Sequence, residues 1–114
     1  MFFKRKKRRV FCSPAVMLSI VQEAHEKGEP IQIWVRYNGK KHTFGISAID
    51  HATFYFDHHK FADQEYDTFE QFKSQALLGG QLFISIQDDM EVLEMNAEKP
   101  TIFPVFARYI RTDE

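Results

Sequence analysis

The chain has 114 residues, of which 44% are hydrophobic and 15% aromatic, and its formal net charge is -1. A chain of this length buries about two thirds of the surface that its unfolded form exposes, enough for one independent core. One cysteine, Cys12, excludes an intramolecular disulfide framework and a cysteine-based zinc site. A single cysteine is typical of proteins in the reducing cytoplasm, and we place this protein there. If the protein binds a membrane, we expect it to lie at the inner membrane face.

The charges are divided unevenly along the chain. Six consecutive cations follow residues 1–3, namely Lys4, Arg5, Lys6, Lys7, Arg8 and Arg9. Residues 10–114 carry nine Lys or Arg against sixteen Asp or Glu, a net charge of -7. Because a block of like charges repels itself and resists burial, we predict a basic flexible arm at residues 1–9 and a single domain at residues 10–114.

The apolar stretch that begins at Val10 predicts a helix at residues 14–27. Ser13 is a good N-cap, Pro14 is favourable at the first helical position and Gly28 is favourable at the C-terminal end of the helix. Apolar residues recur between them at helical spacing: Val16, Met17, Ile20, Val21 and Ala24. The stretch is too short to span a membrane. We expect its apolar face to pack on the protein's own sheet rather than to bind a partner.

The Asn38-Gly39 pair predicts a two-residue turn, because a type I′ turn needs a positive φ at both central residues. The turn sets a register for a three-stranded antiparallel meander at residues 30–57. The expected pairs are Tyr37 with Lys40, Val35 with His42, Ile33 with Phe44, Ile31 with Ile46, Phe44 with Phe56 and Ile46 with Phe54. A slip by one residue would turn every phenylalanine to the wrong side, so the register is strongly specified.

The other face of this meander carries Trp34, which the register places opposite Thr43 and diagonal to Gly45. Gly45 leaves room for the indole to lie toward Tyr55. Trp34, Arg36 and Tyr55 therefore form a candidate ligand face, an aromatic platform beside a cation that suits stacking on a base, a sugar or a peptide side chain. The alternative, which we favour, is that the C-terminal residues 100–111 cover it.

The second half of the chain predicts one more helix, at residues 68–78, between a capping box at Asp67 and Glu70 and the terminator Gly79-Gly80. A hairpin of two strands, 81–87 and 90–95, should follow, and then a closing segment that fits a helix or, because of Pro104, a strand. The predicted fold is α+β: an antiparallel sheet, formed by a three-stranded meander plus a two-stranded hairpin, packed by two or three helices.

The run Tyr66-Asp67-Thr68-Phe69-Glu70-Gln71-Phe72 lies after the phenylalanine-rich hairpin and before a short strand pair. This arrangement resembles short bacterial proteins assigned to families of unknown function. The resemblance rests on aromatic spacing and implies no active site.

Histidines are the other candidate chemistry. The register places His42 opposite His58, close enough to share a divalent metal, with a third ligand from His59, Asp63 or Glu65. Two histidines at the end of a sheet are more often polar residues at the rim of a core, so we expect no bound metal and no cofactor. No glycine pattern cradles phosphate, and no base is placed beside Cys12. The sequence thus predicts a protein without catalytic residues.

The basic arm is the strongest functional signal. An anionic membrane leaflet would attract each of Lys4–Arg9, and Phe2 and Phe3 could insert beside them. Nucleic acid is a second candidate partner, although the net charge of -7 on residues 10–114 opposes the approach of a long polyanion. A solvated arm without a partner is the third alternative. A protein partner and the oligomeric state are left open by the sequence.

Overall fold

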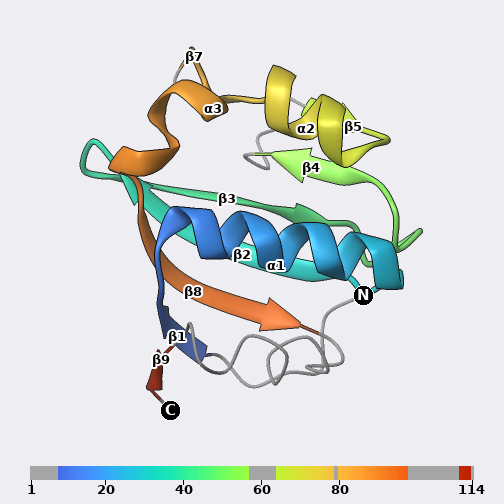
Figure 1. Cartoon of the computed structure of the whole chain (residues 1–114), viewed down its shortest axis with the longest axis horizontal. Helices are drawn as coiled ribbons and strands as arrows, with labels where there is room; N and C mark the ends of the chain where they lie inside the picture. The colour runs from blue at the N-terminus through green and yellow to red at the C-terminus, as the bar shows by residue number, and fades with distance from the viewer. Residues whose placement is uncertain (1–7, 57–63, 79, 98–110, 114) are drawn as a thin grey trace.

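The computed structural model describes residues 8–56, 64–78, 80–97 and 111–113 (Figure 1). Their elements are β1 (Arg8–Phe11), α1 (Pro14–Lys27), β2 (Ile31–Tyr37), β3 (Lys40–Ile46), β4 (Phe54–Phe56), β5 (Gln64–Tyr66), α2 (Phe69–Gln75), β6 (Leu77–Leu78), β7 (Gln81–Leu82), α3 (Phe83–Ile86), the 3-10 turn η1 (Gln87–Asp89), β8 (Glu91–Ala97) and β9 (Arg111–Asp113).

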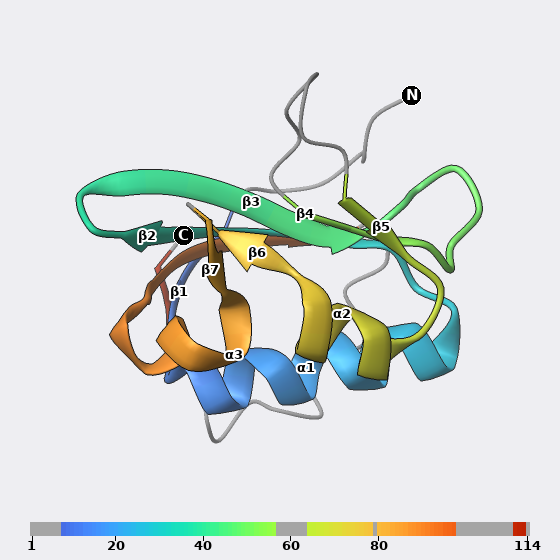
Figure 2. The same cartoon turned by 90° about the horizontal axis from the view of Figure 1, so that it is seen from above.

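Seven of the described strands form one antiparallel sheet in the order β5-β4-β3-β2-β8-β1-β9, and β6 and β7 form a separate hairpin. Helices α1, α2 and α3 lie on one side of the large sheet, as Figure 2 shows. The predicted α+β class, with an antiparallel sheet, a two-stranded hairpin and three helices, is confirmed. None of the helices in the described ranges is long and apolar enough to cross a membrane.

Helix α1 begins and ends where the sequence predicts. The Ser13 hydroxyl accepts a hydrogen bond from the Val16 N–H at 3.2 Å, which caps one of the unpaired amides of the first turn. Gly28 ends the helix in the left-handed conformation (φ 68°), and its N–H donates to the carbonyls of Ala24 and His25. Met17, Ile20, Val21 and Ala24 are fully buried against the sheet, so the apolar stripe packs within the protein.

The predicted meander register is confirmed at every pair. Asn38 and Gly39 have positive φ angles of 53° and 79°, as a type I′ turn requires. The pairs run from Tyr37 with Lys40 to Ile31 with Ile46, and Phe44 and Ile46 then pair with Phe56 and Phe54. Among the residues whose burial the structure describes, four members of these pairs on the helix side of the sheet are fully buried: Ile33, Phe44, Ile46 and Phe54.

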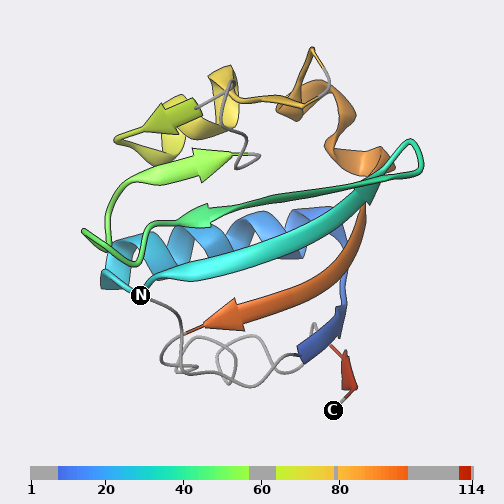
Figure 3. The ribbon, with the colours of Figure 1, turned by 180° about the vertical axis from the view of Figure 1, so that it is seen from behind.

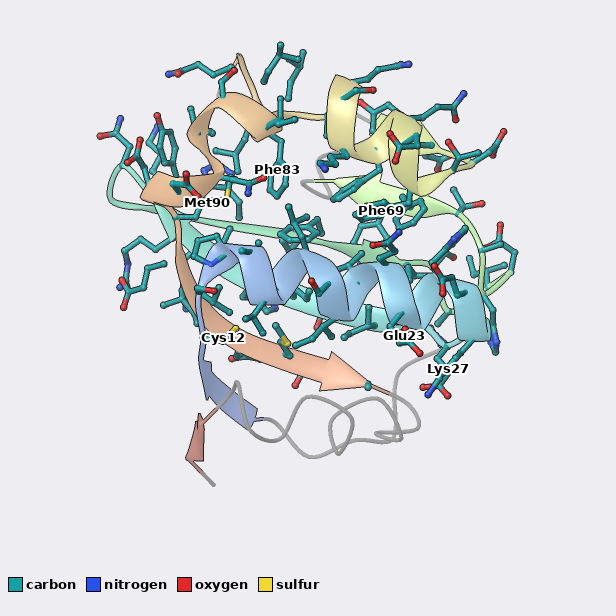
Figure 4. All side chains as sticks on the ribbon, in the orientation of Figure 1. Cys12, Glu23, Lys27, Phe69, Phe83 and Met90 are labelled. Carbon is teal, nitrogen blue, oxygen red and sulfur yellow. The ribbon has the colours of Figure 1, made fainter. Side chains whose placement is uncertain are left out.

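The core is a cluster of aromatic rings between the sheet and the short helices. Phe44 of β3 lies 5.5 Å, between ring centroids, from Phe72 of α2 and from Phe83 of α3. Phe54 stacks on Phe72 at 5.1 Å, and all four rings are fully buried. Figure 4 shows Phe69 and Phe83 directed from α2 and α3 toward the strands. The aromatic side chains thus fix α2 and α3 on the meander.

The predicted hairpin of residues 81–87 with 90–95 is wrong. Of the first predicted strand, only Gln81 and Leu82 are extended, and they pair with β6, whereas residues 83–86 form α3. The second predicted strand is present as β8. Phe83 and Ile86 are buried and Ile84 is exposed, which is helical rather than alternating spacing. Strand β8 pairs instead with the long strand β2, from Ile31 with Ala97 to Arg36 with Glu91.

The predicted second helix is four residues shorter than expected. It starts after Thr68, whose hydroxyl accepts from the Gln71 N–H at 3.1 Å, while the Gln71 side chain accepts from the Asp67 N–H. The capping box therefore uses Thr68 and Gln71 rather than Asp67 and Glu70. The helix ends at Gln75 because Leu77 and Leu78 enter the β6–β7 hairpin.

The predicted boundary between arm and domain also needs correction. Strand β1 begins at Arg8 and pairs with β8 through Arg8 with Met95 and Arg9 with Glu94. The last two cations of the basic block therefore belong to the sheet and not to an arm before it. Lys4, Arg5, Lys6 and Lys7 lie outside the described residues.

The closing segment is described only at its end. Residues 111–113 form β9, which pairs with β1 at the edge of the sheet. The expected cover of the Trp34 face by residues 100–111, and the alternative of a helix there, fall on residues 98–110 and lie outside the part that the structure describes.

Candidate functional site

The face of the sheet opposite the helices is centred on Trp34 of β2. Figure 3, viewed from behind, shows β2, β3 and β8 in front of α1, with no described helix on this side. Trp34 pairs with Thr43 of β3 and with Glu94 of β8. Because directly opposed residues of antiparallel strands share a face, these side chains flank the indole. Trp34 itself is only partly buried.

A bulge in β8 lies beside Trp34. Trp34 pairs with Glu94 and the next residue, Val35, pairs with Val92, so Leu93 is an extra residue in the ladder. Bulges redirect side chains locally and are frequent next to functional sites. Here the bulge keeps Glu94 on the Trp34 face while Val92 is buried in the core.

Arg36, predicted as the cation beside Trp34, has a partner on the neighbouring strand. Its Nη1 lies 3.0 Å from Glu91 Oε1, and both side chains are exposed. An exposed pair of this kind contributes little to stability, about 0 to 1 kcal/mol. It does neutralise the charge of Arg36, so the guanidinium is less available to an anionic ligand than the sequence predicts.

Tyr55, the third predicted member of the face, pairs with Gly45 across β3 and β4. Burial raises the pKa of Tyr55 above its ordinary value, and a hydrogen bond with the Thr43 side chain lowers it by less. The Thr43 hydroxyl also donates to the Ile33 carbonyl at 3.0 Å. Tyr55 is therefore a neutral, held side chain and not an acid-base group at physiological pH.

Gly45 has a different role from the one that the sequence predicts. A Cβ built on this residue would overlap the carbonyl oxygen of Ile31 on the neighbouring strand. Strands β2 and β3 thus approach too closely at Gly45 for any side chain. Gly45 therefore allows the close approach of β2 and β3, in addition to leaving space on the Trp34 face.

A buried amide lies next to Trp34, and the sequence did not reveal it. Asn96 of β8 is 0% exposed. Its Nδ2 donates to Gln32 Oε1 at 3.2 Å and to Glu94 Oε2 at 2.8 Å, whereas its Oδ1 has no hydrogen-bond partner. A buried acceptor without a donor is unfavourable by about 1 to 3 kcal/mol, and such groups are rare in native structures. The only sequence signal was the alternation of polar Glu94 and Asn96 with apolar Met95 and Ala97.

The predicted metal ligands are not brought together in the described part of the chain. His42 lies in β3 opposite Val35, and Glu65 lies in β5 opposite Tyr55. His58, His59 and Asp63 lie outside the described residues. Within the described ranges no three His, Cys, Asp or Glu side chains gather in a group that could hold a metal. The shared site of His42 and His58 stays a prediction.

Cys12 is not an activated thiol. It is partly buried against the core beneath α1, and burial raises its pKa from 9.0 to about 11. The thiolate, which is the reactive form, is therefore scarce at neutral pH. Figure 4 shows the side chain near the start of α1, close to the described strands.

No family model, curated protein or solved structure matches this chain. The resemblance of the Tyr66–Phe72 run to bacterial families of unknown function therefore stays a prediction.

Proposed function

We propose that this protein is a small, cytoplasmic, non-enzymatic interaction module that contacts an anionic membrane surface through Lys4, Arg5, Lys6, Lys7, Arg8 and Arg9. The observation that carries the proposal is the division of charge, six cations in residues 4–9 against a net charge of -7 in residues 10–114. Each cation near an anionic leaflet is attracted by about 1 kcal/mol. Phe2 and Phe3 supply apolar side chains for insertion beside the headgroups.

The position of β1 supports this use of the basic segment. Arg8 and Arg9 are paired into the sheet, so the four cations before them are joined to the fold without an intervening linker. A polybasic segment that is tethered in this way brings the whole module to the surface that it binds. No cofactor is needed for this function.

Nucleic acid is the second candidate polyanion. It is disfavoured because acidic residues of the module would repel the flanking phosphates of a long strand. A flat membrane contacts only one side of the module, so it is exposed to fewer of these acidic residues. A small metal-binding protein or enzyme that uses His42 and His58 is the third candidate, and it rests on the predicted register alone.

A full-length variant with Lys4→Gln, Arg5→Gln, Lys6→Gln and Lys7→Gln tests the proposal, because it removes four charges and leaves β1 intact. Its matched control removes four lysines from the described surface instead: Lys27, Lys40, Lys41 and Lys73. Both proteins, with the wild type, are sedimented with vesicles of phosphatidylserine and phosphatidylcholine and titrated with a labelled single-stranded oligonucleotide.

The proposal predicts vesicle binding by the wild type and by the control, and its loss in the variant that lacks the basic segment. Binding to the oligonucleotide but not to vesicles would instead support the nucleic-acid function. Equal vesicle binding by all three proteins would refute a role for the segment.

A further inference from the structure

The exposed apolar side chains of the described residues gather around the β6–β7 hairpin. Four large apolar side chains are exposed in the described ranges, and three of them lie there: Leu77 at 42%, Leu82 at 42% and Ile84 at 45%. Leu77 and Leu82 are directly opposed in the hairpin, so they share one face, while Leu78 on the other face is buried. Exposed apolar side chains that gather in one place mark interaction surfaces, unlike single ones.

Charged residues of opposite sign flank this apolar patch. Lys73 lies in the last turn of α2, shortly before Leu77, and Asp88 and Asp89 lie in η1, shortly after Ile84. Figures 1 and 2 show α2 and the end of the α3–η1 segment on opposite sides, with the hairpin and α3 between them. Within the part of the chain that the structure describes, Lys73, Asp88 and Asp89 form no ion pair. The patch therefore has a positive side and a negative side.

We propose that the patch of Leu77, Leu82 and Ile84 binds the same patch of a second copy of this chain, in a two-fold symmetric dimer. A two-fold axis through the patch places η1 of one copy against α2 of the other. Lys73 of each copy then faces Asp88 and Asp89 of the second copy, so the surface is complementary to itself. Because three side chains cover less than the roughly 800 Å² per partner of a standard interface, the dimer is weak and forms at high protein concentration.

The charges beside the patch favour a second copy over a membrane. Asp88 and Asp89 are exposed and would be repelled by the anionic leaflet of the proposed function. Strand β1, which contains Arg8 and Arg9, lies at the opposite end of the molecule from the β6–β7 hairpin, as Figures 1 and 3 show. The contact goes beyond the proposed membrane function and uses none of residues 4–9, so either claim can fail while the other holds.

Sedimentation velocity of the full-length chain, from about 10 µM to about 1 mM protein in about 150 mM salt, tests the contact. The average mass of the wild type should rise with concentration toward that of a dimer. Leu82→Glu and Ile84→Glu should each weaken the association about tenfold or more, because each places two like charges in the apolar centre of the contact. Ile49→Glu is the matched control, since Ile49 is exposed outside the patch, and it should associate as the wild type does.

A charge exchange tests the two-fold orientation. Lys73→Glu, and separately Asp88→Lys with Asp89→Lys, should each weaken the association about fivefold, because like charges then face each other across the contact. The protein that carries all three substitutions should associate as tightly as the wild type, because opposite charges face each other again. Thermal unfolding of every variant checks that it folds, and the rescue by the triple variant cannot come from a loss of folding.

The inference is overturned if the wild type stays monomeric at every concentration, or if Leu82→Glu and Ile84→Glu associate as tightly as Ile49→Glu. Failure of the triple variant to restore the association would overturn the two-fold arrangement. A wild type that stays monomeric but loses binding to phosphatidylserine vesicles on Leu82→Glu would assign the patch to the membrane instead, and this outcome also overturns the inference.

Discussion

Phe44→Ala should be among the most destabilising substitutions in this protein. The Phe44 side chain is 0% exposed, and its ring lies 5.5 Å from both Phe72 and Phe83, the residues that fix α2 and α3 on the meander. The substitution removes the phenyl ring and leaves a cavity between β3, α2 and α3. These three elements are separate parts of the backbone and are not free to move together into the cavity. Because such a site collapses poorly, we expect the upper part of the range for buried phenylalanine, about 4 to 5 kcal/mol.

That loss is large against the stability of the whole domain. A chain of 114 residues has a free energy of unfolding of roughly 6 to 17 kcal/mol. At about 4 °C per kcal/mol, the melting temperature should fall by roughly 15 to 20 °C. Urea unfolding followed by circular dichroism and by Trp34 emission gives the free energy directly, and coincident transitions would establish that the unfolding is two-state.

Ile49→Ala is the control for this substitution. Ile49 is an apolar residue at 94% exposure, and its truncation should change the free energy of unfolding by less than about 0.5 kcal/mol. A loss of less than about 1 kcal/mol for Phe44→Ala would show that Phe44 is not in the core. The meander register would then be wrong, and with it the assignment of Trp34 to the opposite face.

Three further predictions concern the cap, the thiol and the indole. Ser13→Ala should destabilise the protein by about 1 kcal/mol in urea unfolding, because the Val16 N–H loses its acceptor. Cys12 should react with iodoacetamide at about pH 8 roughly 100-fold more slowly than a free cysteine, because its pKa of about 11 leaves less thiolate; equal rates would contradict the burial. Trp34 should be quenched by acrylamide in the native protein, because its side chain is only partly buried. A blue-shifted emission that resists quenching would instead support the cover by residues 100–111.

The local signals in the sequence were sufficient for the first half of the fold. Ser13, Pro14 and Gly28 set the ends of α1, and the Asn38-Gly39 turn set a register that also placed Phe54 and Phe56 correctly. Each of these features depends on residues within a few positions of one another. Backbone preference and the two-residue period of a strand therefore determine them without knowledge of the rest of the chain.

The second half depended on contacts that are distant in sequence. Strand β8 inserts between β2 and β1, and its partner residues are 55 or more positions away in the sequence, so no turn residue indicates the pairing. The run from Leu82 to Ile86 is apolar enough for a strand or a helix. The burial of Phe83 against Phe44 and Phe72 decides for the helix, and this packing cannot be read from the segment itself.

The candidate site was predicted in part for the same reason. Trp34, Arg36 and Tyr55 share the meander register and were placed near one another from the sequence. Glu94 and Asn96 come from β8, so the carboxylate and the buried amide beside Trp34 could not be foreseen. The partner of Arg36 was missed as well, because Glu91 belongs to the same strand.

The most direct test of the account is the salt dependence of vesicle binding by the intact chain. Co-sedimentation with phosphatidylserine vesicles, measured between about 50 and 200 mM salt, should show affinity that falls steeply as the charges are screened. The variant with Lys4–Lys7 replaced by glutamine should not bind at any salt concentration, and its melting temperature should equal that of the wild type. Binding that is independent of salt, or that survives the four substitutions, would contradict the account.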